Sequence, residues 1–310
     1  MSLQKITTRS AKLCLGAAAI TMVVGSTGYV SAASAHTVVD DESDNLPDVL
    51  SLDAVIRDFK AAQAQGGHPD FQSFAGTTTV GLVEEYLGDD GNPAVADLRG
   101  MKISSEFRDS DGRNIMPSLY NPELGDTQGY LQQGGSGNGF SSENSFSQWY
   151  RDVPGVNVSK SISLELKRVP GTNRYVFDSG TDAPYNSMGG FFPINGELFG
   201  NYTADKNFHF TTEVRTQFNF DRDSGQTFKF TGDDDVWVYI DGRLVIDLGG
   251  LHPEREQFID LDRLDWLQDG KTYDLSIFHA ERRTSGSNFR IETTIQLRGV
   301  ELPITSALFD

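Results

Sequence analysis

Three consecutive acidic residues, Asp233, Asp234 and Asp235, are the side chains whose type and spacing most clearly suggest chemistry in this sequence. Adjacent carboxylates repel one another unless water or a cation compensates their charge, and oxygen ligands of this kind favour Ca²⁺. Successive side chains of a strand point to opposite faces, so two neighbours share one ion only where a kinked or cis peptide turns both the same way. The alternative interpretation is a solvated acidic turn.

The residues on either side of the aspartates predict the strands that position them. Phe228 and Phe230 alternate with polar residues, as on a half-buried strand. Residues 236–240 are apolar on both faces, as in a strand inside a sandwich. Asp241-Gly242 then predicts a two-residue hairpin turn, because that turn requires positive φ at both positions. The acidic run is therefore expected at the junction between two strands.

The composition and the remaining patterns predict an all-β fold. The chain contains 32 glycines, 20 phenylalanines and 10 tyrosines, which fits a β domain with many turns. Alternating apolar residues recur at 162–166, 214–220, 273–277 and 289–297. We expect a single large antiparallel β-sandwich or barrel over residues 51–300, with long loops and a few short helices.

The N-terminal 35 residues have the features of a secretory signal peptide. Basic residues precede an apolar run, and a small-residue cleavage site follows; these are Lys5, Arg9 and Lys12, residues 13–25, and residues 33–35. The single cysteine, Cys14, lies in this segment, so the mature chain is expected to have no disulfide. Residues 36–50 are predicted to be a disordered acidic leader and residues 301–310 a C-terminal tail, and no membrane anchor is seen.

The charge and the leader together restrict the partners and the location. A formal net charge of −18 argues against nucleic acid and anionic membranes as partners. The signal peptide predicts a protein that is secreted to the extracellular space or the cell surface, with the periplasm as the alternative.

Several motifs, taken in order, resemble the signature of the fibro-slime domain family. The resemblance runs from about Val55 to Leu297, and its motifs are residues 68–71 (HPDF), 148–157 (QWYRDVPGVN), 191–194 (FFPI), 207–213 (NFHFTTE), 232–250 with His252, 280–282 (AER) and 287–293 (SNFRIET). This family is similar to the wider protective-antigen-like (PA-fourteen) superfamily, whose fold is a β-sandwich or barrel found in adhesins, toxins and glycosidase accessory modules.

The resemblance implies a particular calcium site. In the lectin members of the superfamily, two adjacent aspartates joined by a cis peptide and an asparagine from a second loop hold Ca²⁺, and the ion coordinates vicinal hydroxyls of a sugar. Carried over to this chain, the metal ligands are Asp233, Asp234 and Asn288. Because Asp235 is an additional acid, the pair Asp234 and Asp235 is the alternative.

The second loop of this chain is more charged than a simple lectin loop. It holds Glu281, Arg282 and Arg283, of which Glu281 and Arg282 are expected either to contact the metal or to brace the loop by pairing with Asp235 or Asp247. The resemblance predicts no specific sugar-binding side chain. Trp237, Tyr239 and Trp266 either stack on sugar rings or, as is usual for aromatic residues in alternating strands, pack in the core.

These observations predict a secreted, calcium-assisted carbohydrate-binding or adhesion module of the extracellular matrix or cell surface, with an extracellular glycan or polysaccharide as its partner. One alternative is a structural matrix protein in which calcium only joins loops. A second alternative is a polysaccharide-acting enzyme with acids such as Glu213 and Glu281, or with His252, His279 and Asp247. No nucleophile elbow is present, and we expect no catalytic residue.

Overall fold

The computed structural model of the chain describes residues 46–133, 139–284 and 286–299. The predicted signal peptide, most of the predicted leader and the predicted C-terminal tail lie outside these residues. The first strand, β1 (Val49–Phe59), begins within the last two residues of the range predicted as leader.

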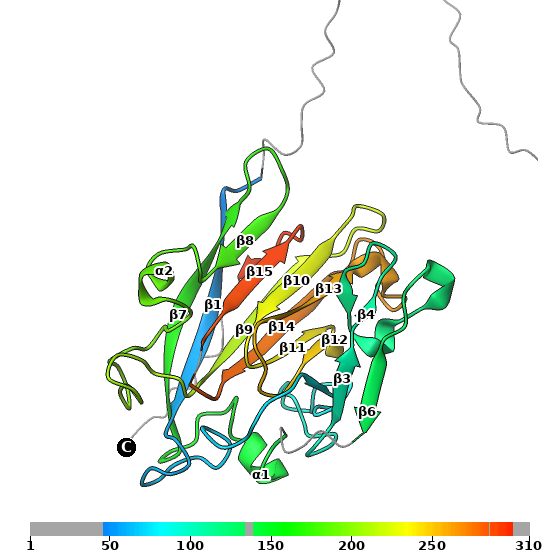
Figure 1. Cartoon of the computed structure of the whole chain (residues 1–310). Coiled ribbons are helices and arrows are strands. Elements are labelled where there is room, and N and C mark those ends of the chain that lie inside the picture. The colour runs from blue at the N-terminus through cyan, green and yellow to red at the C-terminus, as the bar shows by residue number, and fades with distance from the viewer. Residues whose placement is uncertain (1–45, 134–138, 285, 300–310) are drawn as a thin grey trace, which may run out of the picture. The chain divides into compact units, whose positions relative to one another are not determined.

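The described residues form mainly β-strands, as the sequence predicts (Figure 1). The remaining strands are β2 (Thr79–Val80), β3 (Met101–Ser105), β4 (Phe107–Arg108), β5 (Asn114–Ile115), β6 (Tyr130–Gln133), β7 (Asn157–Arg168), β8 (Tyr175–Asp178), β9 (Phe210–Asn219), β10 (Thr227–Gly232), β11 (Asp235–Ile240), β12 (Arg243–Leu248), β13 (Arg255–Asp260), β14 (Thr272–Glu281), β15 (Phe289–Thr293) and β16 (Arg298–Gly299). The helical segments are short: α1 (Glu143–Phe146), α2 (Tyr185–Met188), η2 (Pro117–Leu119), η3 (Pro122–Leu124) and η4 (Leu261–Arg263).

The main sheet has 11 antiparallel strands and is nearly closed. Ten of them follow the order β12-β11-β14-β9-β1-β7-β8-β15-β10-β13, and β16 pairs with β9. The two end strands of this order, β12 and β13, are joined by the hydrogen bonds of one side chain. The amide of Gln257 in β13 accepts a hydrogen bond from the backbone N–H of Asp247 in β12 and donates one to its carbonyl, each at 2.9 Å. The predicted antiparallel all-β fold is confirmed.

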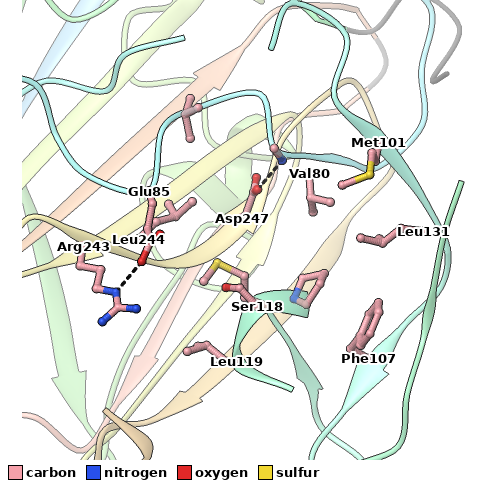
Figure 2. Close-up of a pocket in the computed structure, with 14 residues that line it drawn as sticks. Val80, Glu85, Met101, Phe107, Ser118, Leu119, Leu131, Arg243, Leu244 and Asp247 are labelled. Carbon is pink, nitrogen blue, oxygen red and sulfur yellow. Dashed lines mark hydrogen bonds and ion pairs between the residues drawn. The ribbon is translucent and has the colours of Figure 1, made fainter. Parts of the chain in front are cut away.

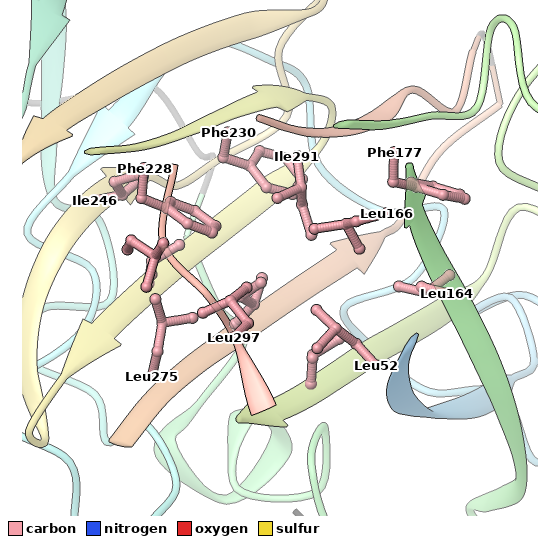
Figure 3. Close-up of a cluster of buried hydrophobic side chains, with 14 of the residues drawn as sticks. Leu52, Leu164, Leu166, Phe177, Phe228, Phe230, Ile246, Leu275, Ile291 and Leu297 are labelled. Atoms are coloured by element: carbon pink, nitrogen blue, oxygen red, sulfur yellow. The ribbon is translucent and has the colours of Figure 1, made fainter. Parts of the chain in front are cut away.

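Two hydrophobic cores explain why the central strands are apolar on both faces. One core lies on the inner face of the main sheet and includes Phe228, Phe230 and Leu275, which Figure 3 shows pointing into the same cluster. The other lies on the opposite face, beneath the loops around Trp149 and Phe146. Every residue of β11 is buried, because alternate side chains of this strand enter the two cores.

The hairpin turn after β11 has the predicted conformation. Asp241 and Gly242 have φ angles of 53° and 72°, and Ile240 pairs with Arg243 across the turn.

The segment between β2 and β6 forms a separate three-stranded sheet in the order β2-β3-β6, and β4 pairs with β5. This segment contacts the residue after β12 through an isolated bridge between Thr79 and Gly249.

Candidate functional site

Strand pairing places Asp233 and Asp234 opposite the loop that follows β14. Gly232 at the end of β10 pairs with Phe289 of β15, whereas Asp235 at the start of β11 pairs with Ala280 of β14. The chain therefore changes partner strands at Asp233 and Asp234, and the peptide bond between these two residues is cis. Gly232 permits the close approach, since a Cβ at this position would lie 2.4 Å from the carbonyl oxygen of Asn288.

Two of the predicted metal ligands, Asp233 and Asn288, are in direct contact through hydrogen bonds. The backbone N–H of Asn288 donates to Asp233 Oδ1 at 2.5 Å, and its side-chain amide donates to Oδ2 at 2.9 Å. The backbone carbonyl of Asp233 accepts a hydrogen bond from His279 Nε2 at 2.9 Å. Burial lowers the pKa of His279 to about 4, so this imidazole is neutral at physiological pH.

Two further buried carboxyl groups, those of Asp234 and Glu281, lie near Asp233. The backbone N–H of Arg282 donates to Asp234 Oδ2 at 3.1 Å. Burial and the neighbouring Asp235 raise the pKa of Asp234 to about 8. The side chain of Glu281 is also buried, its Oε2 atom has no hydrogen-bond partner among the described residues, and burial together with Asp234 raises its pKa well above the usual value.

The third aspartate has a different role. Asp235 forms a fully buried ion pair with Arg282, whose Nε lies 2.6 Å from Oδ2 and whose second terminal nitrogen lies 3.1 Å from Oδ1. The backbone N–H of Gly250 also donates to Asp235. Arg282 further donates to the carbonyl of Gly139 and stacks on the Trp149 ring at 5.0 Å. The carboxylate of Asp235 is thus engaged, and Asp233 and Asp234 are the adjacent pair that faces an open cavity.

This cavity has a volume of about 440 Å³. Its lining is polar and comes from four parts of the chain: Gly76, Asp233 and Asp234, residues 251–254 (Leu251, His252, Pro253, Glu254), and Arg283, Gly286 and Asn288. Gly76 and Glu254 carry no sequence signal of their own, because they reach the cavity only through the crossing of distant loops. His252 belongs to the signature motif, but the sequence does not indicate its position beside the aspartates.

The remaining residues considered from the sequence are not assembled into a second site. Glu213 forms ion pairs with Arg57 at 2.7 Å and Arg215 at 2.6 Å. Trp237 and Tyr239 are fully buried, so they are core residues. Asp235 and Asp247 are the two expected ion-pair partners of Arg282, and the structure pairs Arg282 with Asp235. Asp247 instead accepts hydrogen bonds from Gly81 and the Trp237 indole. Glu281 pairs with neither aspartate.

The oxygen atoms of the residues around this cavity can be compared with the ligands that calcium requires. Within the described residues, no group of three or more His, Cys, Asp and Glu side chains is arranged to hold a metal. Calcium, however, also accepts amide and carbonyl oxygens. Rotating the Asn288 amide by half a turn would replace its nitrogen with its oxygen beside Asp233. The carboxylates of Asp233 and Asp234 and this amide oxygen are of the types that calcium accepts as ligands.

One known protein family matches the part of the chain that contains this site. Residues 196–302, which contain the aspartates and both loops, match the PA14 domain. This part of the chain is thus similar to the PA14 domain, and the predicted resemblance to the protective-antigen-like superfamily is confirmed. PA14 domains are binding modules, so the general binding role predicted from the sequence is also supported.

Curated relatives come from Dictyostelium discoideum. Protein psiQ is 33% identical over 267 residues, which cover 82% of this chain and 22% of psiQ. Protein psiH is 32% identical over 234 residues, covering 74% of this chain and 29% of psiH. The chain thus spans less than a third of the length of these relatives.

Solved structures overlap only in part. The PA14 domain of the MpAFP antifreeze protein covers 34% of this chain and 60% of its own, with 12% identity and a TM-score of 0.23. A PA14 sugar-binding domain from an RTX adhesin covers 31% and 51%, with 17% identity and a TM-score of 0.22. Overlaps with TM-scores this low carry no structural argument.

Over the described residues, no helix is both long and apolar enough to cross a membrane.

The raised carboxyl pKa values lead to a prediction about pH. Asp234 titrates near pH 8 in the folded chain but near pH 3.9 when unfolded, so between these values the folded state binds the extra proton. Without divalent cations, we expect the free energy of unfolding to fall by about 1.4 kcal/mol per pH unit for this one group as the pH rises from 4 to 8. Urea denaturation in EDTA at several pH values measures this slope.

A comparison variant isolates Asp234 from the other buried acids. Burial also raises the pKa of Asp58 to about 6 and that of Asp247 to about 7, and both contribute in the same direction at lower pH. Asp234→Asn should therefore remove the largest share of the slope between pH 7 and 8, where Asp58 and Asp247 contribute least. An unchanged slope in that window would contradict the electrostatic description of the site.

Proposed function

We propose that this chain is a secreted, calcium-assisted module that binds carbohydrate or mediates adhesion at the cell surface or in the extracellular matrix, without catalytic activity. The observation that carries the proposal is the convergence of Asp233, Asp234 and Asn288 on one open, polar cavity within the part of the chain that matches the PA14 domain. Asp233, Asp234 and the oxygen of Asn288 would hold Ca²⁺. The bound ion would supply the coordination positions that vicinal sugar hydroxyls fill.

The pattern of buried charges supports a cation at this position. Asp233, Asp234 and Glu281 are buried carboxyl groups without an ion-pair partner among the described residues, and the nearest buried cation, Arg282, is already paired with Asp235. A buried charge is costly unless it is compensated, and a divalent cation would compensate two of them.

A binding experiment with and without calcium tests the proposal. The purified chain should bind a subset of sugars on a glycan array in Ca²⁺, and EDTA should abolish that binding. Asp234→Asn should abolish it as well, whereas Arg99→Ala, a change at an exposed arginine distant in sequence from both loops, should not. Binding that persists in EDTA would refute the role of calcium, and visible hydrolysis of a glycan would refute the absence of catalysis.

A structural role for the ion is the second candidate, and one observation favours it. Asp233 and Asn288 already join the two loops through two hydrogen bonds, so a cation between them would strengthen an existing contact. In that case Ca²⁺ would raise the melting temperature, while the glycan array would remain blank. The two measurements together therefore separate a lectin from a matrix protein.

A further inference from the structure

A second cavity lies between the β2-β3-β6 sheet and β12. It is separate from the cavity lined by Asp233 and Asp234, which we call the acidic cavity. The second cavity has a volume of about 540 Å³, which is within the range of small-molecule sites. Apolar side chains form most of its wall, and Figure 2 shows Val80, Met101, Phe107, Leu131 and Leu244 around the same space. It shares no lining residue with the cavity at Asp233 and Asp234.

One buried carboxylate, that of Asp247, lies in this apolar wall. Asp247 is 4% exposed, and Figure 2 shows its side chain between Leu244 and Val80. Its Oδ2 accepts a hydrogen bond from Gly81 N–H at 2.7 Å, and its Oδ1 accepts one from the Trp237 indole at 3.1 Å. A carboxylate has about four acceptor positions, so one donor can still be added.

No cation compensates this carboxylate within the part of the chain that the structure describes. Arg243, the basic residue in the wall of the cavity, donates instead to Glu85 at 2.8 Å and lies 4.2 Å from the Trp266 ring centre. Arg243 and Glu85 cancel each other, which leaves the cavity with the negative charge of Asp247. Burial raises the pKa of this carboxyl group to about 7, which is the expected response of a buried acid without a partner.

We propose that this cavity binds a small organic cation with an apolar body, such as a primary amine attached to an aromatic or branched aliphatic group. The ammonium group would donate to Asp247, and the apolar body would contact Met101, Phe107, Leu131 and Leu244. The charge of the cavity favours a cation over a neutral or anionic ligand of the same shape, because a buried carboxylate repels an anion and is not neutralised by an alcohol.

Three probes that differ only in their head group test this inference on the full chain. Phenethylamine, 2-phenylethanol and 3-phenylpropanoate share the phenylethyl body and carry an ammonium, a hydroxyl and a carboxylate group. Isothermal titration at pH 8 in EDTA, which removes any contribution of calcium, should give the order amine, alcohol, carboxylate, with the amine roughly tenfold tighter than the alcohol. Equal affinities for the amine and the alcohol, or no binding of the amine, would overturn the proposal.

Two variants locate the binding within the molecule. Asp247→Asn should reduce the preference for the amine over the alcohol to about twofold or less, because the two head groups then meet a neutral amide. Leu131→Trp fills the cavity without changing Asp247 and should abolish binding of all three probes. Leu124→Trp, at a position that is 49% exposed and outside the cavity, is the matched control. If Asp247→Asn does not fold, an unchanged amine affinity in Leu131→Trp still refutes the site.

Discussion

Replacing Asp234 by Asn should remove calcium binding and, at the same time, stabilise the calcium-free protein. The carboxylate of Asp234 lines the acidic cavity, and under the proposed function its charge would be among the main sources of cation affinity there. We expect the dissociation constant for Ca²⁺ to rise by roughly two orders of magnitude, since the charge of the ligands tunes calcium affinity over several decades. Calorimetric titration of both proteins at pH 8 measures this change.

The opposite effect on stability follows from the same electrostatics. Burial raises the pKa of Asp234 to about 8, so at pH 8 and without a cation the folded state retains a costly negative charge beside Asp235 and Glu281. Asn has nearly the same shape and can still accept the hydrogen bond from Arg282 N–H. In EDTA the variant should therefore melt at a higher temperature than the wild type, whereas in Ca²⁺ the order should be reversed.

Asp58→Asn is the matched control for this pair of measurements. Asp58 is fully buried, burial raises its pKa to about 6, and it accepts hydrogen bonds from Asn207 and Phe199 outside the acidic cavity. Its replacement should change the pH dependence of stability but leave calcium affinity unaltered. If Asp234→Asn binds Ca²⁺ as tightly as the wild type, or if Asp58→Asn weakens binding equally, the assignment of the site is wrong.

The sequence predicts the strands around this site well because their patterns are local. Phe228 and Phe230 alternate along β10, residues 236–240 are apolar throughout, and Asp241-Gly242 forms the hairpin turn, as expected. The sequence does not show which adjacent pair among Asp233, Asp234 and Asp235 is free to hold an ion, because three identical side chains in a row do not reveal which one has another partner. The buried guanidinium of Arg282, 47 residues further along the chain, makes that distinction.

Features created by long-range contacts could not be predicted in the same way. The apolar cavity around Asp247 forms only when the β2-β3-β6 sheet packs near β12, and neither segment alone indicates a hollow. Glu254 and Gly76 reach the acidic cavity from loops that the sequence gives no reason to bring together. The closure of the main sheet through the Gln257 side chain is likewise visible only when both strands are in place.

Removing the side chain of Arg282 should produce a large loss of stability. Arg282→Met would leave the fully buried carboxylate of Asp235 without its ion-pair partner, and breaking a buried pair in this way costs about 3–5 kcal/mol. For a domain of this size that corresponds to a decrease in melting temperature on the order of 10 °C. Differential scanning calorimetry in EDTA measures it without interference from calcium.

A second substitution shows whether the uncompensated charge is the cause. Asp235→Asn in the Arg282→Met background removes the orphaned charge and keeps an acceptor for the backbone N–H of Gly250, so it should recover more than half of the lost stability. Arg283→Met, at the exposed neighbouring arginine, should change the free energy of unfolding by only about 0.5 kcal/mol. No recovery in the double variant would mean that packing of Arg282 on Trp149 and its bond to Gly139, rather than the ion pair, stabilise this part of the fold.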